Sequence, residues 1–357
     1  MTTAQLFDVA IVGAGPGGST AALGLARAGY RVVLIDKSSF PRHKVCGDAI
    51  PNNAMRLLQD HYSDLAIRIR EDAACPIDGY QAFWKGRRIA QGSWSMQAIN
   101  SARKSFDQVL LEAALEEPNC QLAAPHRIQT IMRQNDGNWQ LTDNQGQSFW
   151  ARALTLAQGA NGDFRQQIGL PSMDKSQWGV AGSQYRTHWN PMPNRNLFFI
   201  PKSMSLPGYF WIFPVGGNRC NVGFGVISKQ PVKLKSLYEE VCQNDPKIAK
   251  FLEGTQAETE FQGHKIPIPT KPIRNSSPGV LLIGDAAELV DPLYGHGIDK
   301  AIISGHWAAE ALIQGFSKND LESFDDYEAQ IQTRLWPEMR SSYRKMRTLS
   351  IASRFIP

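Results

Sequence analysis

The stretch from Phe7 to Lys37 constrains the fold more than any other part of this 357-residue chain. It reads FDVAIVGAGPGGSTAALGLARAGYRVVLIDK: an apolar strand, a glycine-rich turn, a helix rich in alanine and leucine, and a second apolar strand. Its glycines have the G-x-G-x-x-G spacing of a dinucleotide-binding unit. We therefore predict strands over 7–12 and 31–35, a helix that begins near Ser19, and a Rossmann-type α/β fold.

Each glycine of this turn has its own task in binding a dinucleotide. Gly13 makes the tight turn, Gly15 lets the backbone approach a pyrophosphate, and Gly18 lets helix and strand pack closely. The helix N-terminus then faces the negative charge of the pyrophosphate. At the end of the second strand, Asp36 accepts hydrogen bonds from the ribose hydroxyls, and its charge disfavours a 2′-phosphate. Lys37 follows directly and completes the predicted cofactor contacts of this unit.

A second strand–turn–helix pattern lies near the other end of the chain, in PGVLLIGDAAELVDPLYGHGIDKAIISG. An apolar strand over 280–283 ends in Gly-Asp, which places a carboxylate where a ribityl hydroxyl could bind it. The rigid loop that follows exposes backbone N–H groups at a helix start, and these can stabilise the negative charge of a reduced flavin ring. The predicted cofactor residues here are Gly284, Asp285, Pro292, Gly295, Gly297 and Ile298.

Composition excludes several other classes of protein. Hydrophobic residues make up 42% and charged residues 20% of the chain, as in globular proteins. The five cysteines are odd in number and widely spaced, and they suggest neither a disulfide framework nor a metal site. The N-terminus lacks the basic region of a signal peptide, and no segment approaches the roughly 20 apolar residues of a membrane span. We expect a soluble, cytoplasmic protein.

The net charge of +5 is partly concentrated near the C-terminus. Basic residues there face only Glu338; they are Arg334, Arg340, Arg344, Lys345, Arg347 and Arg354. This pattern fits a solvated helical face, and the alternative is peripheral contact with an acidic partner or an anionic membrane surface. Aromatic and basic residues do not interleave, so we expect no nucleic-acid partner.

The pair of glycine motifs resembles the FAD-dependent hydroxylase (PHBH-like) superfamily, in which a discontinuous FAD domain surrounds a sheet-bearing substrate domain. ARKSFDQVLLEAA is similar to the family's Arg-x-x-Phe-Asp helix, which implies that Arg103 lies against FAD. ALTLAQGANGDFR resembles its Asp-Gly segment, with Gln158 at the acidic position, while Gly159 and Arg165 still fit. The family's acid supports cofactor and nicotinamide binding, so this departure puts in doubt the use of NAD(P)H as the electron donor.

Within this superfamily, PRHKVCGDAI resembles the geranylgeranyl reductase branch, which has a Lys-x-Cys-Gly segment beside the isoalloxazine. The resemblance implies that the loop over 40–51 carries Lys44 and Cys46 to the mouth of the cavity, with Gly47 allowing close backbone approach. Cys46 is then either a soft apolar wall or a group that interacts with the reacting carbon or the flavin.

The same branch has a Tyr-x-Trp-x-Phe-Pro motif followed by Gly-x-Gly, and GYFWIFPVGGNRCNVGFGV supplies both, the latter as Gly223 and Gly225. The alternation of Tyr209, Trp211 and Phe213 is what a half-buried strand requires, and the resemblance turns these rings over the flavin. The candidate catalytic residues are Lys44, Cys46, Tyr209, Trp211, Phe213 and Pro292.

We expect a discontinuous FAD-binding domain over 1–74, 98–170 and 275–330. An antiparallel-sheet substrate domain occupies 75–97 and 171–274, and a C-terminal helical tail occupies 331–357. Asp-Gly and Gln-Gly turns between residues 126 and 157 mark a three-stranded meander.

The leading functional hypothesis is an FAD-dependent oxidoreductase, since the cofactor carries the chemistry in such enzymes. The motifs favour hydride transfer to a carbon–carbon double bond, as in geranylgeranyl reductases. The substrate region, however, is broken by Pro, Asn, Lys and Arg, and the C-terminal part is short for a C20-lipid enzyme. We therefore favour a monooxygenase acting on a bulky aromatic or otherwise electron-rich substrate, including a side chain of a precursor protein, over the reductase. A flavin halogenase and a non-catalytic prenyl-binding escort protein are minor alternatives.

Overall fold

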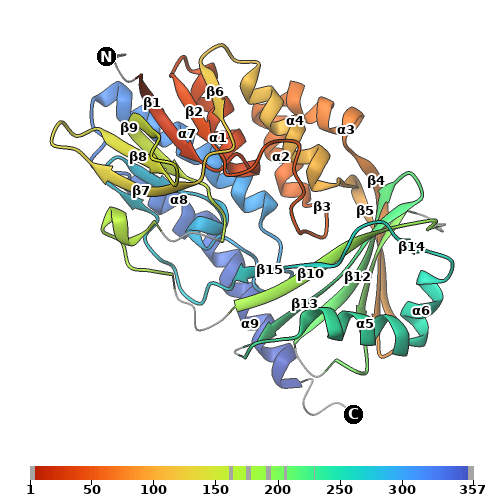
Figure 1. Cartoon of the computed structure of the whole chain (residues 1–357). Helices are drawn as coiled ribbons and strands as arrows, with labels where there is room; N and C mark the ends of the chain where they lie inside the picture. Colours follow the sequence, from red (N-terminus) through yellow and green to blue (C-terminus); the bar gives the residue numbers. More distant parts are fainter. Residues whose placement is uncertain are drawn as a thin grey trace. The chain divides into compact units, whose positions relative to one another are not determined.

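A computed structural model describes residues 5–160, 164–173, 178–189, 194–204, 207–228 and 230–352 (Figure 1). The backbone divides into two compact units, each discontinuous in sequence. Unit 1 comprises Met1–Arg42, Asp107–Asp174 and Pro269–Arg344. Unit 2 comprises His43–Phe106, Lys175–Ile268 and Lys345–Pro357.

The sheet of unit 1 confirms the predicted Rossmann-type α/β fold. Its strand order is β16-β17-β9-β1-β2-β6, and the neighbours from β17 to β6 are all parallel. The strands are β1 (Leu6–Val12), β2 (Val32–Ile35), β6 (Cys120–Ala123), β9 (Ser148–Leu156), β16 (Ser276–Ser277) and β17 (Val280–Leu282). The central strands are buried on both faces, which explains their continuous apolar runs.

The predicted meander follows β6 and is confirmed. It consists of β7 (Ile128–Arg133), β8 (Trp139–Asp143) and β9, paired antiparallel in that order. Gly137 and Gly146 have φ values of 84° and 87° in the two connecting turns, a conformation that glycine adopts at little cost.

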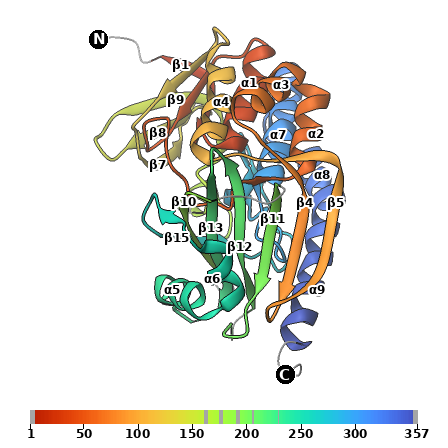
Figure 2. The same cartoon turned by 90° about the vertical axis from the view of Figure 1, so that its right-hand side faces the viewer.

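Two helices of unit 1 follow the glycine motifs. Helix α1 (Pro16–Arg27) begins three residues before the predicted Ser19, because Gly15 caps it and Pro16 occupies its first position. Helix α7 (Ile298–Lys318) begins directly after Gly297 and is the helix expected after the second glycine motif. The two helices lie side by side with their backbones in close approach (Figures 1 and 2). A Cβ added at Gly17 would lie 2.8 Å from the carbonyl oxygen of Ala301.

The remaining helical segments complete unit 1 and extend toward the C-terminus. Two 3-10 turns lie at Gln166–Ile168 and Gly284–Ala287. Helix α8 (Asp325–Gln330) leads through a π-helical stretch (Ile331–Leu335) into α9 (Trp336–Ala352). Helix α4 (Arg103–Leu115) spans the boundary between the units.

Unit 2 contains a second, mostly antiparallel sheet with the order β14-β10-β13-β12-β11-β4-β5-β3, and β15 also pairs with β10. These strands are β3 (Ala49–Ile50), β4 (Cys75–Trp84), β5 (Arg87–Asn100), β10 (Trp178–Thr187), β11 (Arg195–Ile200), β12 (Gly208–Gly216), β13 (Arg219–Ser228), β14 (Gln256–Ala257) and β15 (Gln262–Pro267). The helices are α2 (Asn52–His61), α3 (Ser63–Asp72), α5 (Leu234–Asn244) and α6 (Pro246–Leu252).

Helices α5 and α6 cover one face of this sheet (Figure 2). The apolar core on that face joins Tyr238 of α5 and Ile248 of α6 to Phe210 and Phe224 of the strands. Side chains alternate across a strand, so residues 209, 211 and 213 of β12 face the other way. The face of β12 that points away from α5 and α6 therefore carries the aromatic residues singled out in the sequence.

The boundaries of the two compact units differ from the domain boundaries expected from the sequence. Residues 43–74 and 98–106 lie in unit 2, whereas the sequence placed them in the FAD-binding domain. The reason is pairing at long range: β3 joins β5 through Ala49 and Asn100, and Asn100 also donates to the carbonyl oxygen of Pro214. Local patterns do not reveal such bonds.

Two further observations concern the cysteines and the length of the helices. All five cysteines, which lie within the described residues, are free. Within the described ranges, none of the helices is both long enough and apolar enough to cross a bilayer.

Candidate functional site

The glycine turn of unit 1 is shaped by close backbone contacts. Gly13 has a φ of 109°, and a Cβ there would lie 2.3 Å from the carbonyl oxygen of Ala157. A Cβ at Gly18 would lie 1.9 Å from the carbonyl oxygen of Gly13. By contrast, a Cβ at Gly15 would meet only a guanidinium nitrogen of Arg42, at 3.5 Å. Gly13 and Gly18 thus close the turn, while Gly15 leaves the N-terminus of α1 open to an anion.

Asp36 follows β2 and is buried beside this turn. Its Oδ2 accepts from the backbone N–H of Ala14 at 2.9 Å, and its Oδ1 accepts from that of Ser38 at 2.9 Å. Arg42 lies 3.9 Å from the same carboxylate and 3.2 Å from the carboxylate of Asp107. The carboxylate is thus held in place at the strand end, with further lone pairs for a ligand hydroxyl. The neighbouring Lys37 is exposed.

The second predicted motif lies in the same unit. Gly284 has a φ of 57° at the end of β17, and Asp285 follows it. A Cβ added at Gly297, the residue that caps α7, would lie 3.2 Å from Oδ1 of Asp285. The structure therefore brings the predicted ribityl carboxylate next to the start of α7.

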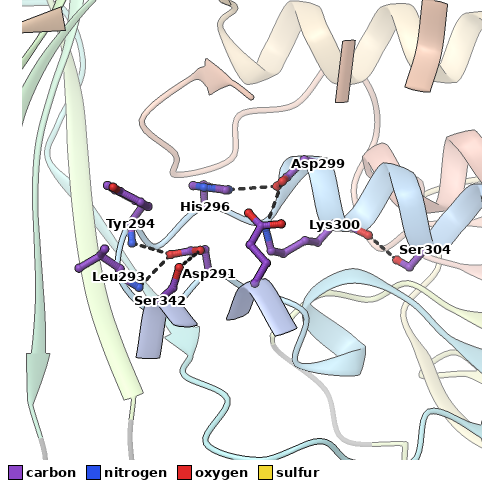
Figure 3. A network of polar contacts seen from close by, with 9 residues as sticks. Asp291, Leu293, Tyr294, His296, Asp299, Lys300, Ser304 and Ser342 are labelled. Carbon is purple, nitrogen blue, oxygen red and sulfur yellow. Dashed lines mark hydrogen bonds and ion pairs between the residues drawn. The ribbon is translucent and has the colours of Figure 1, made fainter. Parts of the chain in front are cut away.

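The loop before α7 is organised by a residue that the sequence analysis missed. Oδ1 of the buried Asp291 accepts from the backbone N–H groups of Leu293 and Tyr294, both at 2.9 Å (Figure 3). Its other carboxylate oxygen accepts from the hydroxyl of Ser342 on α9 at 2.7 Å. The Asp-Pro pair at 291–292 was a local turn signal, whereas the contact with α9 required the fold.

A buried ion pair lies at the start of α7 (Figure 3). Nζ of Lys300, which is 0% exposed, lies 3.1 Å from Oδ2 of Asp299 and 3.9 Å from a carboxylate oxygen of Glu338. Nδ1 of His296 lies 3.0 Å from Oδ1 of Asp299. Burial raises the pKa of Asp299, but the hydrogen bond and charge of His296 and the charge of Lys300 prevail and lower it to about 2.

In unit 2 the aromatic strand β12 carries the predicted rings on one face. The indole of Trp211 lies between the rings of Tyr209 and Phe213, with centroids 5.7 and 6.1 Å away. Trp211 faces Gly223 on β13, where a Cβ would lie 2.1 Å from the indole. The Gly-x-Gly of the sequence therefore has a packing role, because Gly223 leaves the space that the indole fills.

The loop that carries Cys46 packs directly on this aromatic face. A Cβ at Gly47 would lie 3.3 Å from the ring of Phe213 and 3.5 Å from the indole of Trp211. The carbonyl oxygen of Cys46 accepts from the hydroxyl of Ser183 at 3.0 Å and from the amide of Asn221 at 2.8 Å. Two motifs far apart in the sequence thus meet within one unit.

Asp48 and Arg103 complete a polar cluster around Cys46. Asp48 is 0% and Arg103 4% exposed, and the backbone N–H of Arg103 donates to Oδ1 of Asp48 at 3.3 Å. Burial raises the pKa of the Cys46 thiol, although the positive charge of Arg103 opposes this shift. Cys46 is therefore a neutral thiol at physiological pH. Lys44, in the same loop, is half-buried.

The model of the FAD binding domain family matches residues 7–342, almost the whole of this chain. The chain belongs to this family. It is an FAD-dependent oxidoreductase, as the sequence analysis expected, and the predicted resemblance to the superfamily and its geranylgeranyl reductase branch is confirmed.

This FAD binding domain protein is similar to several curated reductases. It is 29% identical to the menaquinone reductase of Mycobacterium tuberculosis, over 99% of this chain and 84% of the relative. It is 26% identical to digeranylgeranylglycerophospholipid reductase 1 of Methanopyrus kandleri, over 96% of this chain and 90% of the relative. A solved structure of a geranylgeranyl bacteriochlorophyll reductase-like protein from Thermoplasma acidophilum superposes with a TM-score of 0.83 at 23% identity. That match covers 98% of this chain and 88% of the other.

The described residues of unit 1 fit the cofactor of the family. The open backbone at Gly15 suits a pyrophosphate, Asp36 suits a ribose, and Asp285 suits a ribityl chain. Gln158 directly follows the residue that packs against Gly13, so the departure from the family pattern lies beside the turn. The buried guanidinium of Arg165 is held by its neighbours, since it donates to the carbonyl oxygen of Pro171 and to Oδ1 of Asn275.

Proposed function

We propose that this FAD-dependent oxidoreductase saturates a carbon–carbon double bond in an apolar, isoprenoid-bearing substrate. The observation that carries the proposal is the neutral Cys46 thiol, which packs with its loop on an aromatic face and can act as an acid. Support also comes from the curated relatives, which match nearly the full chain and are named reductases of menaquinone or of digeranylgeranylglycerophospholipid.

In this proposal unit 1 holds FAD through the residues that fit it. The backbone around Gly13, Gly15 and Gly18 receives the pyrophosphate, Asp36 the ribose and Asp285 the ribityl chain. Asp291 holds the loop that begins at Pro292 in shape, because it accepts from the N–H groups of Leu293, Tyr294 and Gly295. The end of that loop at Gly297, with Ile298 of α7, would supply N–H groups for the flavin ring. When bound and reduced, FAD supplies a hydride.

The residues of unit 2 then serve the substrate. Tyr209, Trp211 and Phe213 give an apolar surface for an isoprenoid chain and exclude water from the reacting bond. The Cys46 thiol donates the proton to the carbon that does not receive the hydride, and its thiolate regains a proton from solvent. One hydride and one proton thus add across the double bond, which balances the reaction.

The electron donor and the cellular setting are also part of the proposal. We take NAD(P)H as the reductant, with slow reduction of the flavin because Gln158 replaces the family's carboxylate. The free cysteines favour the reducing cytoplasm. The basic residues of α9 would allow peripheral contact with an anionic membrane, where such a substrate resides.

The test uses the FAD-loaded enzyme, reduced with dithionite under nitrogen and mixed with menaquinone or with a geranylgeranyl lipid. We expect the substrate to gain two hydrogens, as measured by mass spectrometry. The same mixture exposed to ¹⁸O₂ tests the monooxygenase expected from the sequence, including its aromatic and precursor-protein substrates. Incorporation of labelled oxygen, without saturation under nitrogen, would replace the reductase with that alternative.

Substituting the thiol by a hydroxyl isolates the role of Cys46. A hydroxyl is a far weaker acid, so Cys46→Ser should lower kcat by about 10²-fold or more and leave FAD content unchanged. The matched control is Cys242→Ser, at the other half-buried cysteine of unit 2, which should leave kcat as it is. An unchanged kcat in Cys46→Ser would assign Cys46 to the wall of the site and remove it as the acid.

A further inference from the structure

Asp48 stands out as a buried carboxylate that neither the sequence motifs nor the proposed reaction uses. It has a φ of 65°, in the left-handed region that favours glycine, asparagine and aspartate. Its carbonyl oxygen accepts from the backbone N–H of Ser101 at 2.8 Å. Its Oδ1 accepts from the N–H of Arg103, the first residue of α4, so the carboxylate caps that helix. These hydrogen bonds fix the orientation of Asp48.

A single amide ties Asp48 to Cys46 and to the aromatic face. Nδ2 of Asn221 donates to Oδ2 of Asp48 at 2.7 Å and to the carbonyl oxygen of Cys46 at 2.8 Å, which uses both of its N–H groups. Its Oδ1 accepts from Nε1 of Trp211 at 2.9 Å. The position of Asp48 is therefore fixed relative to both the cysteine and the indole.

Burial is the largest cause that raises the pKa of the Cys46 thiol, and two charged side chains act on it in opposite directions. Arg103 favours the thiolate through its charge and a hydrogen bond, whereas the charge of Asp48 disfavours it, although the backbone N–H of Asp48 also favours the thiolate. Burial raises the pKa of Asp48 to about 6, against hydrogen bonds from Tyr185 and Asn221, so Asp48 is mostly ionised at pH 7.5. Near the Tyr185 ring lie His43 and Arg219, the latter paired with Glu258.

We propose that Asp48 is a positioning residue that offsets the charge of Arg103 and so adds to burial in keeping Cys46 in its neutral, proton-bearing form. Without the carboxylate, only burial would oppose the guanidinium, and a larger share of Cys46 would be thiolate, which has no proton to donate. The consequence for catalysis rests on the proposed function, but the effect on the thiol does not.

The test compares the wild type with Asp48→Asn in the FAD-loaded protein. Asparagine tolerates the left-handed backbone and keeps the size of the side chain. Iodoacetamide reacts with the thiolate, and peptide mass spectrometry follows the modification of Cys46 from pH 6 to pH 10, with Cys242 as the internal reference. Loss of a nearby charge shifts a pKa by about one unit or more, so we expect Cys46 to react about tenfold faster at pH 7.5. The rate at Cys242 should not change.

An unchanged rate and midpoint for Cys46 in folded Asp48→Asn would overturn the inference. If that variant fails to fold, Tyr185→Phe provides a second route. Removing this hydroxyl leaves Asp48 less ionised, so Cys46 should still react faster, by a smaller factor. Asp60→Asn, at an exposed carboxylate on α2, should have no effect. Equal Cys46 rates in Tyr185→Phe and the wild type would then refute the inference.

Activity separates this inference from the proposed function. If Asp48→Asn accelerates alkylation and lowers kcat at unchanged KM, both stand. If alkylation accelerates but the wild type saturates no double bond, the proposed function fails and the control of the thiol by Asp48 stands. If the wild type reduces its substrate and alkylation is unaffected, the role of Asp48 fails alone.

Discussion

At the scale of single residues, two glycines of one motif have different roles. A Cβ at Gly223 would lie 2.1 Å from the Trp211 indole and 2.7 Å from the carbonyl oxygen of Gly182. Neither group can move away without a loss of packing or of strand pairing. A Cβ at Gly225 would meet nothing closer than 3.4 Å. The Gly-x-Gly pattern therefore contains one position that the packing of Trp211 requires and one that tolerates a methyl group.

Alanine substitutions at Gly223 and Gly225 test this difference through the stability of the folded chain. Gly223→Ala should lower the free energy of unfolding by about 1–3 kcal/mol through overpacking. Gly225→Ala should change it by less than about 1 kcal/mol, and toward greater stability, because alanine has less freedom in the unfolded chain. Urea unfolding of both variants measures the difference. Equal effects would mean that Trp211 can move away from Gly223.

At the scale of elements, the contact between α9 and the loop before α7 links the end of the chain to the proposed flavin site. The hydroxyl of Ser342 donates to Asp291, whose other oxygen holds the loop N–H groups of Leu293 and Tyr294. Lys300 and Glu338 form a second, longer contact between α7 and α9. Together they hold the loop against the helix.

We expect Ser342→Ala to loosen this loop. Loss of a buried hydrogen bond to a carboxylate costs about 1–3 kcal/mol, and a loop that is free to move binds a flavin less tightly. The dissociation constant of FAD, measured by fluorescence titration, should rise about tenfold. Ser317→Ala, at an exposed serine on α7, is the control and should bind FAD as the wild type does. Equal affinity in both variants would show that α9 does not support the loop.

At the scale of the whole molecule, a cofactor that binds only the folded chain must stabilise it. At a free FAD concentration of 100 times its dissociation constant, the gain is about 2.7 kcal/mol. Asp285→Ala removes the proposed ribityl contact, so FAD should raise its melting temperature much less than that of the wild type. Asp326→Ala, an exposed site on α8, should respond to FAD normally. A full response to FAD in Asp285→Ala would remove the ribityl assignment.

The elements with local signals follow from the amino-acid sequence alone. The glycine spacing, the apolar run before it and the acid after it predicted β1, α1, β2 and Asp36, because the backbone at those positions is dictated by short-range geometry. The same holds for the meander and for the start of α7. The alternation in β12 also indicated which ring positions share a face.

The surroundings of Cys46, in contrast, depend on contacts that form only in the folded chain. Arg103, Asn221 and Trp211 lie far from Cys46 and Asp48 in the sequence, and their hydrogen bonds exist only when β12, β13 and the start of α4 are assembled. Residues 43–74 lie in unit 2 for the same reason, because β3 pairs with β5 at long range. Burial in this assembled cluster raises the pKa of the Cys46 thiol, against the charge of Arg103. The energy of a charge depends on the groups and the solvent around it in space, and sequence neighbours do not define these.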